Sequence, residues 1–186
     1  MLLVIGLTGL ASSGKGEVAR YLEKNGFSKF VFSDVLKEEA EKRGLLENKT
    51  YEEQKNIFSK LGDQLRRENG RWDILAEKLI EKIKSNNLEK VVVDGFRSVE
   101  EVNLFKKNFQ NFYLIYVNAD EEIRFKRRKL EDSNIDIENF RARDKRDIEE
   151  KGLEKVIELT DFTIDNNEEG LENLHKKIDE FLEKIH

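Results

Sequence analysis

The chain has 186 residues, of which 38% are hydrophobic and 39% are charged, with a formal net charge of -5 and no cysteine. This length suits one domain with a sizeable core, and the lack of cysteine excludes disulfides and cysteine-bound zinc. The negative charge argues against a nucleic-acid partner, and no apolar run reaches the roughly 18 residues that a membrane span needs. We therefore expect a single domain over residues 1–186, in a soluble cytoplasmic protein that is a monomer or a homodimer.

The first predicted element is a strand that leads directly into a phosphate-binding loop. Residues 2–7 form a short apolar run, Gly9-x-x-x-x-Gly14-Lys15 follows, and an amphipathic helical run comes next. Strand, glycine-rich loop and helix in this order are the context of a P-loop, whose backbone N–H groups cradle phosphates. The residues expected to hold the nucleotide here are Gly9, Ala11, Ser12, Ser13, Gly14, Lys15, Gly16 and Glu17.

One feature of this loop is unusual. Position 16 is glycine, where many P-loops carry a serine or threonine hydroxyl for Mg²⁺, and Glu17 supplies no hydroxyl either. We therefore expect the metal to be held through water and by carboxylates elsewhere in the chain.

A long helical excursion over residues 34–84 follows the second predicted strand. Ser33 and Asp34 are expected to cap its first helix, and Thr50 with Glu53 forms a capping box for the next one. Excursions of this length after a strand are where a substrate site is built. The predicted elements are a strand over residues 27–32 and helices over residues 35–42, 50–69 and about 72–84.

The rest of the chain continues to alternate strands and helices. A second excursion, over residues 125–151, follows the fourth strand and is expected to form a lid. Strands that carry almost no charge favour a parallel sheet covered on both faces. We therefore predict a P-loop NTPase fold of the α/β class, with three α/β/α layers and a five-stranded parallel sheet. The remaining predicted strands cover residues 91–93, 112–117 and 162–164, with helices around residues 98–108, 120–130, 141–146, 153–159 and 171–185.

In an open parallel sheet, ligands bind at the carboxyl ends of the strands. The second strand delivers Ser33 and Asp34, with Lys37 one turn later, and the third delivers Asp94 and then Arg97. Phosphoryl transfer needs cationic groups that bind phosphates and carboxylates that bind a metal or accept a proton. Two simpler alternatives remain open, because Asp94 precedes a glycine as turn residues do and Asp34 could only cap its helix.

Three segments together resemble the P-loop nucleoside monophosphate kinases, the family of adenylate kinase. They are residues 9–16, Ser33-Asp34-Val35-Leu36-Lys37, and Val91-Val92-Val93-Asp94-Gly95-Phe96-Arg97. The closer likeness is to archaeal-type P-loop kinases related to adenylate or dephospho-coenzyme A kinase, and it covers most of the chain. The resemblance implies ATP and Mg²⁺ as cofactors and a small-molecule phosphate acceptor. It also implies phosphate-binding arginines before and within the lid, which here are Arg124, Arg128, Arg143 and Arg146.

The chain departs from the pattern of that family at four places, one of which is the glutamine that reads adenine, for which it has no obvious counterpart. Glu17 replaces its threonine, Lys37 replaces an arginine and loses the bidentate geometry, and the proline before Arg97 is missing. A phosphate acceptor is therefore implied, but AMP in particular is not.

The resulting hypothesis is a kinase that transfers the γ-phosphoryl group of ATP to a nucleoside or deoxynucleoside monophosphate or to dephospho-coenzyme A. Lys15 holds the donor phosphates, Asp94 orients Mg²⁺ through water, and Asp34 is the candidate general base or second metal partner. The residues expected to hold the acceptor are Ser33, Lys37, Arg66 and Arg97. The residues expected to close over the phosphoryl group are Arg124, which also binds the nucleotide, Arg128, Arg143 and Arg146.

Simpler alternatives are kept for several of these basic residues. Arg66 fits a solvated helix face, as does Arg127 with its lysine neighbours. The lid arginines could instead pair on the helix surface with Asp144 and Asp147. GTP remains possible as the donor, and a P-loop NTPase or nucleotide-dependent switch without a small-molecule acceptor is the alternative function.

Overall fold

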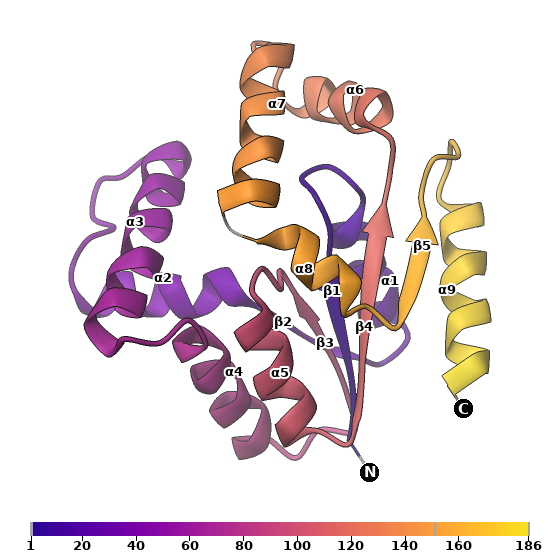
Figure 1. Ribbon diagram of the computed structural model, residues 1–186, viewed down its shortest axis with the longest axis horizontal. Helices are drawn as coiled ribbons and strands as arrows, with labels where there is room; N and C mark the ends of the chain where they lie inside the picture. Colours follow the sequence, from indigo (N-terminus) through magenta and orange to yellow (C-terminus); the bar gives the residue numbers. More distant parts are fainter. Residues whose placement is uncertain (1, 151, 186) are drawn as a thin grey trace.

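A five-stranded, all-parallel sheet forms the centre of the computed structural model, which describes residues 2–150 and 152–185 (Figure 1). The strand order is β2-β3-β1-β4-β5, and each neighbouring pair is parallel. This confirms the predicted fold class. The strands are β1 (Leu3–Thr8), β2 (Ser28–Val31), β3 (Lys90–Asp94), β4 (Asn111–Asn118) and β5 (Phe162–Asp165).

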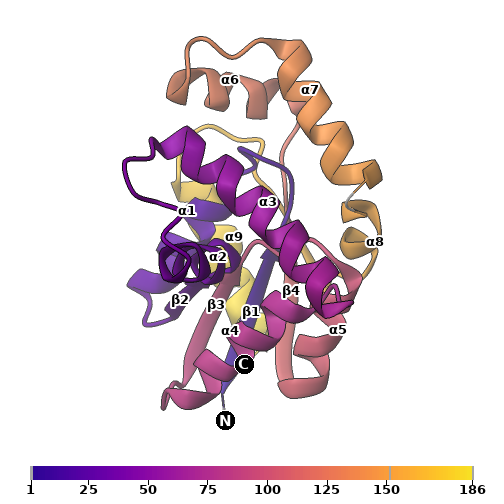
Figure 2. The same cartoon turned by 90° about the vertical axis from the view of Figure 1, so that its left-hand side faces the viewer.

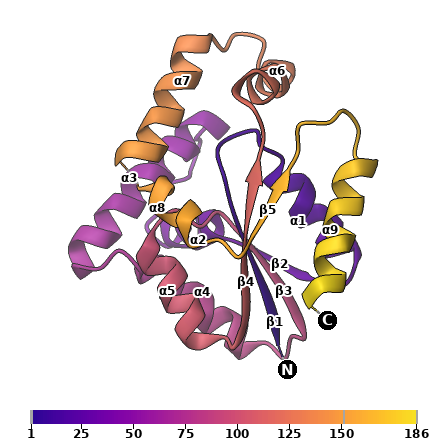
Figure 3. The same ribbon diagram turned by 45° about the vertical axis from the view of Figure 1, so that its right-hand side comes forward.

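Helices cover both faces of the sheet because its central strands are apolar on both sides. The helices are α1 (Lys15–Lys24), α2 (Phe32–Lys42), α3 (Tyr51–Asn69), α4 (Ile74–Ser85), α5 (Val99–Asn108), α6 (Glu121–Glu131), α7 (Ile137–Lys145), α8 (Leu153–Glu158) and α9 (Glu172–Ile185), with a π-helical turn, η1, at Arg146–Glu150. In β3, Val92 packs with residues of α1 and α9, whereas Val91 and Val93 pack with residues of α2–α5 and α8. These two groups of helices lie on opposite faces of the sheet (Figure 3). No helix in the described part of the chain is long and apolar enough to cross a membrane.

The two predicted capping boxes are confirmed. The Thr50 hydroxyl accepts a hydrogen bond from the Glu53 amide at 3.3 Å, and the Glu53 carboxylate accepts one from the Thr50 amide at 2.7 Å. Ser98 and Glu101 make the same reciprocal pair at the start of α5. Each box satisfies backbone donors that the first turn of a helix leaves free, so both helices begin where the local sequence predicts.

The expectation that Ser33 and Asp34 cap the helix after β2 is wrong. The N-cap is Val31 and α2 begins at Phe32, so both polar residues lie inside the first turn and are exposed. The tertiary reason is Phe32, whose ring packs edge-on against Phe96 with ring centroids 5.0 Å apart. Burial of this ring draws the start of the helix towards the core.

The two predicted excursions lie in different parts of the molecule. Helices α2, α3 and α4 form one group beside the sheet, whereas α6 and α7 lie beyond the carboxyl ends of the strands (Figure 1, Figure 2). The predicted lid of residues 125–151 corresponds to most of α6 together with α7 and η1, and its last residue lies outside the described residues. The π-helical turn was not foreseen, and such turns occur frequently at functional sites.

Candidate active site

The loop between β1 and α1 has the backbone of a phosphate-binding loop. Gly9 and Gly14 have φ angles of 144° and 106°, which side chains other than glycine rarely adopt. A Cβ atom at Gly9 would also lie 2.4 Å from the Val117 carbonyl oxygen, and one at Gly14 would lie 2.2 Å from Nδ2 of Asn166. The Gly14 carbonyl accepts the first hydrogen bonds of α1, so the helix N-terminus faces this loop.

Lys15 folds back over the same loop. Its Nζ donates hydrogen bonds of 2.8 Å to the carbonyl oxygens of Gly9 and Leu10. Burial lowers the pKa of Lys15 to about 8; the Asp94 carboxylate opposes this shift, whereas the Arg97 and Arg143 cations add to it. A cation held in such surroundings is stabilised when phosphate anions replace the carbonyl oxygens.

Asp94 ends β3, and its Cα is paired in register with that of Leu7 on the central strand. Burial raises the pKa of its carboxyl group, and the charges of Lys15, Lys29 and Arg97 oppose this shift. Its Oδ1 is buried and has no hydrogen-bond partner among the described residues. A buried carboxylate oxygen without a partner can accept a hydrogen bond from metal-bound water, so this residue fits the expected role towards Mg²⁺.

Other features of the loop bear on the metal. No group of three or more histidine, aspartate or glutamate side chains that could hold a metal occurs within residues 2–150 and 152–185. Mg²⁺ is commonly held by one or two carboxylates together with phosphates of a nucleotide, so a single carboxylate is compatible with it. At Gly16 a Cβ atom would meet nothing within 4 Å, so packing does not require glycine at this position.

A pocket of about 80 Å³ joins the P-loop, the segment after β3 and the lid. Arg97 and Asp147 face each other in it, with Nη1 and Oδ1 3.8 Å apart. Desolvation lowers the pKa of Arg143; Asp147 opposes this, and the nearby Arg97 and Arg128 cations add to it. The pocket therefore collects cations that phosphate groups would stabilise. Its lining residues are Gly9, Ala11, Lys15, Gly95, Phe96, Arg97, Arg143, Asp147 and Leu153.

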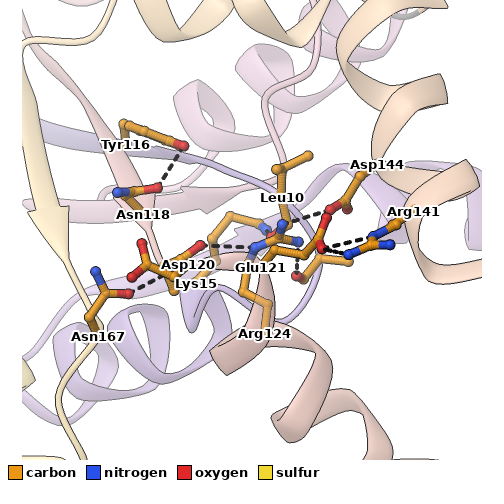
Figure 4. Close-up of polar contacts among 12 residues, drawn as sticks. Leu10, Lys15, Tyr116, Asn118, Asp120, Glu121, Arg124, Arg141, Asp144 and Asn167 are labelled. Carbon is orange, nitrogen blue, oxygen red and sulfur yellow. Dashed lines mark hydrogen bonds and ion pairs between the residues drawn. The ribbon is translucent and has the colours of Figure 1, made fainter. Parts of the chain in front are cut away.

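Arg124 is not among the residues that line the pocket. Its guanidinium is buried and donates to the carbonyl oxygens of Ala11 and Ala119, at 3.3 and 2.9 Å, and to Oδ2 of Asp144 at 2.6 Å (Figure 4). Asp144 and Asp147 are only 7% and 8% exposed, and the ion pair of Asp144 is made with Arg124 on another helix rather than with an arginine on its own helix surface. A partner on another helix buries Asp144, which helical spacing alone does not reveal.

The other expected lid arginines are placed differently. Arg143 lines the pocket, whereas Arg128 and Arg146 are not among the lining residues. Arg128 pairs with Glu131 on its own helix at 3.1 Å, and Arg146 is exposed in η1. The structure thus brings one of these three arginines to the pocket in this conformation.

The residues expected to bind the acceptor are also divided. Arg97 lines the pocket, whereas Ser33 and Lys37 are exposed on α2, as is the candidate base Asp34. Arg66 is not on a solvated face, because its side chain is 18% exposed and lies 3.4 Å from the buried carboxylate of Glu101.

Glu101 links Arg66 to the pocket. Its other carboxylate oxygen accepts the backbone N–H of Arg97 at 2.9 Å. Burial raises the pKa of Glu101, and hydrogen bonds from Arg97 and the charge of Arg66 oppose this shift. Arg66 and the backbone of Arg97 therefore share one buried anchor.

A second set of side-chain hydrogen bonds to the P-loop, besides those of Arg124, was not predicted from the sequence. Arg127 donates to the carbonyl oxygens of Asn166 and Ser13, at 2.7 and 3.4 Å, and the Asn166 amide donates to the same Ser13 oxygen at 2.9 Å. The expectation that Arg127 is on a solvated face is wrong, because α6 packs this part of its surface against the loop. The three-residue spacing of Arg124 and Arg127 places them on one helix face and could have indicated this.

Comparisons with known proteins agree with this architecture. A family model described as an AAA domain matches residues 5–149. A UPF0200 protein of Pyrobaculum aerophilum is 34% identical over 185 residues, covering 98% of both chains. Another, from Methanothermobacter thermautotrophicus, is 33% identical over 187 residues, covering 99% of this chain and 91% of the relative.

The fold is also found among solved kinase structures. The shikimate kinase of Bacteroides thetaiotaomicron is similar with a TM-score of 0.64, covering 100% of this chain and 99% of that one at 11% identity. At this identity the likeness establishes a shared P-loop kinase-like fold and leaves the substrate undetermined.

Proposed function

Because this chain belongs to the UPF0200 family and has a P-loop kinase-like fold, we propose that it is an ATP-dependent phosphotransferase with a small nucleotide-like acceptor. A nucleoside or deoxynucleoside monophosphate or dephospho-coenzyme A fits the chemistry of the acceptor side. The observation that carries the proposal is the convergence of the Lys15 amine, the Arg97 and Arg143 guanidinium groups and the nearby Asp94 carboxylate at one pocket.

On the donor side, the chain's own groups bind and orient phosphates. The P-loop and the N-terminus of α1 bind the β and γ phosphates, and Lys15 exchanges the carbonyl oxygens of Gly9 and Leu10 for phosphate oxygens. Mg²⁺, when bound with ATP, neutralises the charge that develops on the transferred group. Asp94, whose buried Oδ1 is unpaired among the described residues, would hold that ion through water.

On the acceptor side, Arg97 binds an anionic group. Its contact with Asp147 is long, at 3.8 Å, and its side chain is half exposed, so the guanidinium is free to turn towards a phosphate. Lys37, Ser33 and Arg66 extend this region along α2 and α3, and Asp34 takes the proton of the attacking hydroxyl where the acceptor needs a base.

The lid completes the site when it closes. Arg143 already lines the pocket, and Arg128 and Arg146 approach the transferring group as α6, α7 and η1 close over it. Closure excludes water, which would otherwise take the phosphoryl group and make the enzyme an ATPase.

The test is ATP consumption by the purified protein with Mg²⁺, with and without a panel of nucleoside monophosphates, deoxynucleoside monophosphates and dephospho-coenzyme A. We expect one acceptor class to stimulate turnover and to appear as a phosphorylated product, and Lys15→Ala to abolish this activity. Unchanged turnover in Lys15→Ala would contradict the proposal. Hydrolysis that no acceptor stimulates would instead support the P-loop NTPase or switch.

A further inference from the structure

The guanidinium of Arg124 lies at a junction of three elements. It projects from α6, and its nitrogens reach Ala119 after β4, Ala11 of the P-loop and Asp144 of α7, at 2.9, 3.3 and 2.6 Å (Figure 4). The planar fork of arginine fixes the directions of its donors, so this side chain sets the relative placement of the groups it binds.

Burial makes this junction stiff. Arg124 and Asp144 are 4% and 7% exposed, and the Arg124 guanidinium carbon lies 5.2 Å from the centroid of the Phe140 ring. The Oδ1 of Asp144 is buried and has no hydrogen-bond partner within the described residues, so the carboxylate is held through Oδ2. Removal of the Arg124 fork would leave a buried carboxylate without its partner, which is a costly arrangement.

The position of Asp144 determines where its neighbour points. Successive residues of an α-helix are rotated by about 100° around its axis. With Asp144 turned towards α6, the adjacent Arg143 lies on the side that lines the pocket with Lys15 and Ala11. The same guanidinium that holds Asp144 also binds the carbonyl of Ala11, which lines that pocket.

We propose that Arg124 is a positioning residue that acts through Asp144 to hold the lid residue Arg143 in register with the P-loop. It couples the conformation of the loop to that of the lid and needs no contact with the nucleotide to do so. The inference rests on the proposed function, because Arg143 serves phosphoryl transfer only if the protein binds a nucleotide triphosphate.

A second ion pair between the same two helices provides a matched control. Nε and Nη2 of Arg141, on α7, lie 2.8 and 2.6 Å from Oε1 of Glu121, on α6. These side chains are 62% and 39% exposed, and within the described residues no hydrogen bond or ion pair joins either of them to the P-loop. An exposed ion pair of this type contributes little to stability. A variant of Arg141 therefore shows the general effect of removing an ion pair between α6 and α7, against which the effect of the Arg124 variants can be compared.

The experiment compares Arg124→Lys, Asp144→Asn, Arg143→Ala and the control Arg141→Lys in the full chain. We expect Arg124→Lys and Asp144→Asn to lower kcat for Mg·ATP turnover roughly 10–100-fold, as misplacement of a catalytic group does, with ATP affinity by calorimetry little changed. Arg141→Lys should retain natural turnover. Arg124→Lys combined with Arg143→Ala should be no slower than Arg143→Ala alone, because both act on one step.

Hydrogen exchange supplies a readout that does not depend on turnover. Amides of α7 and the P-loop should exchange faster in Arg124→Lys and in Asp144→Asn than in Arg141→Lys. Equal exchange in all three, additive losses with Arg143→Ala, or parallel losses of ATP affinity and kcat would overturn the proposal. If Arg124→Lys does not fold, the isosteric Asp144→Asn decides. If the natural protein binds no ATP, the proposed function fails, while the exchange comparison still tests the coupling.

Discussion

Lys15, at the start of α1, and Asp94, at the end of β3, stabilise each other's charged form against the effect of burial. Burial lowers the pKa of Lys15 and raises that of Asp94, while the charge of each residue counteracts the shift of the other. Both groups therefore lie in surroundings that favour phosphate and a hydrated cation over the ligand-free state. The first two predictions follow from this pair.

ATP binding should take up protons near pH 8. The pKa of Lys15 is about 8 in the ligand-free protein, and phosphate anions favour its charged form. Affinity should therefore decline as the pH rises through 8, where free Lys15 loses its proton. Calorimetry in buffers of different ionisation enthalpy measures the uptake. Lys15→Arg, whose charge persists at these pH values, is the control, and the same pH dependence in that variant would contradict the assignment to Lys15.

Asp94→Asn should separate stability from activity. Because burial raises the folded-state pKa of Asp94, its carboxyl group favours folding below its unfolded-state pKa, and this contribution is lost as the pH rises through the folded-state value. At neutral pH the amide should therefore match or exceed the natural protein in thermal stability. Turnover with Mg·ATP should fall roughly 10–100-fold, as for other residues that orient metal ligands.

Thermal denaturation at several pH values and turnover at pH 7 test the Asp94→Asn prediction together. The stability advantage of the amide should shrink on acidification. An Asn variant that is strongly destabilised at neutral pH would show that the carboxylate supports the fold instead.

Gly16→Ser should lower the Mg²⁺ concentration needed for half-maximal turnover. The added Cβ meets nothing within 4 Å, and the hydroxyl stands where many P-loops bind the metal. Gly16→Ala is the matched control, because it gains helix propensity worth up to about 1 kcal/mol without a hydroxyl. Titration of Mg²⁺ against turnover distinguishes the two, and equal responses from Ser and Ala would refute a role for the hydroxyl.

Arg97→Ala should raise the KM of the acceptor and leave ATP affinity nearly unchanged. Loss of a charge-assisted hydrogen bond of about 1.5–3 kcal/mol corresponds to a rise of roughly 10–100-fold. Arg71→Ala removes an exposed arginine paired with Asp73 and Glu77 and should change neither constant. Steady-state kinetics with the stimulating acceptor and calorimetry with ATP give the two values. A loss of ATP affinity in Arg97→Ala would place this residue on the donor side.

Local sequence was sufficient for the P-loop and for the capping boxes at Thr50 and Ser98. Each of these features depends on residues only a few positions apart. In the capping boxes the hydrogen bonds join residues within a single helical turn. The parallel sheet was also predictable, because its apolar strands alternate with helices. The start of α2 was not, because burial of Phe32 against Phe96 determined it.

The sequence by itself therefore determined the fold class, the phosphate-binding loop and the types of residue at the strand ends. Only the tertiary structure decided which charges meet. The strand order places Asp94 beside the central strand, and α6 directs Arg124 towards Ala11 and Asp144. Helical spacing predicts which residues share a face of a helix. What that face packs against depends on residues far away in the sequence, as Arg124 and Ala11 show, which are more than a hundred positions apart.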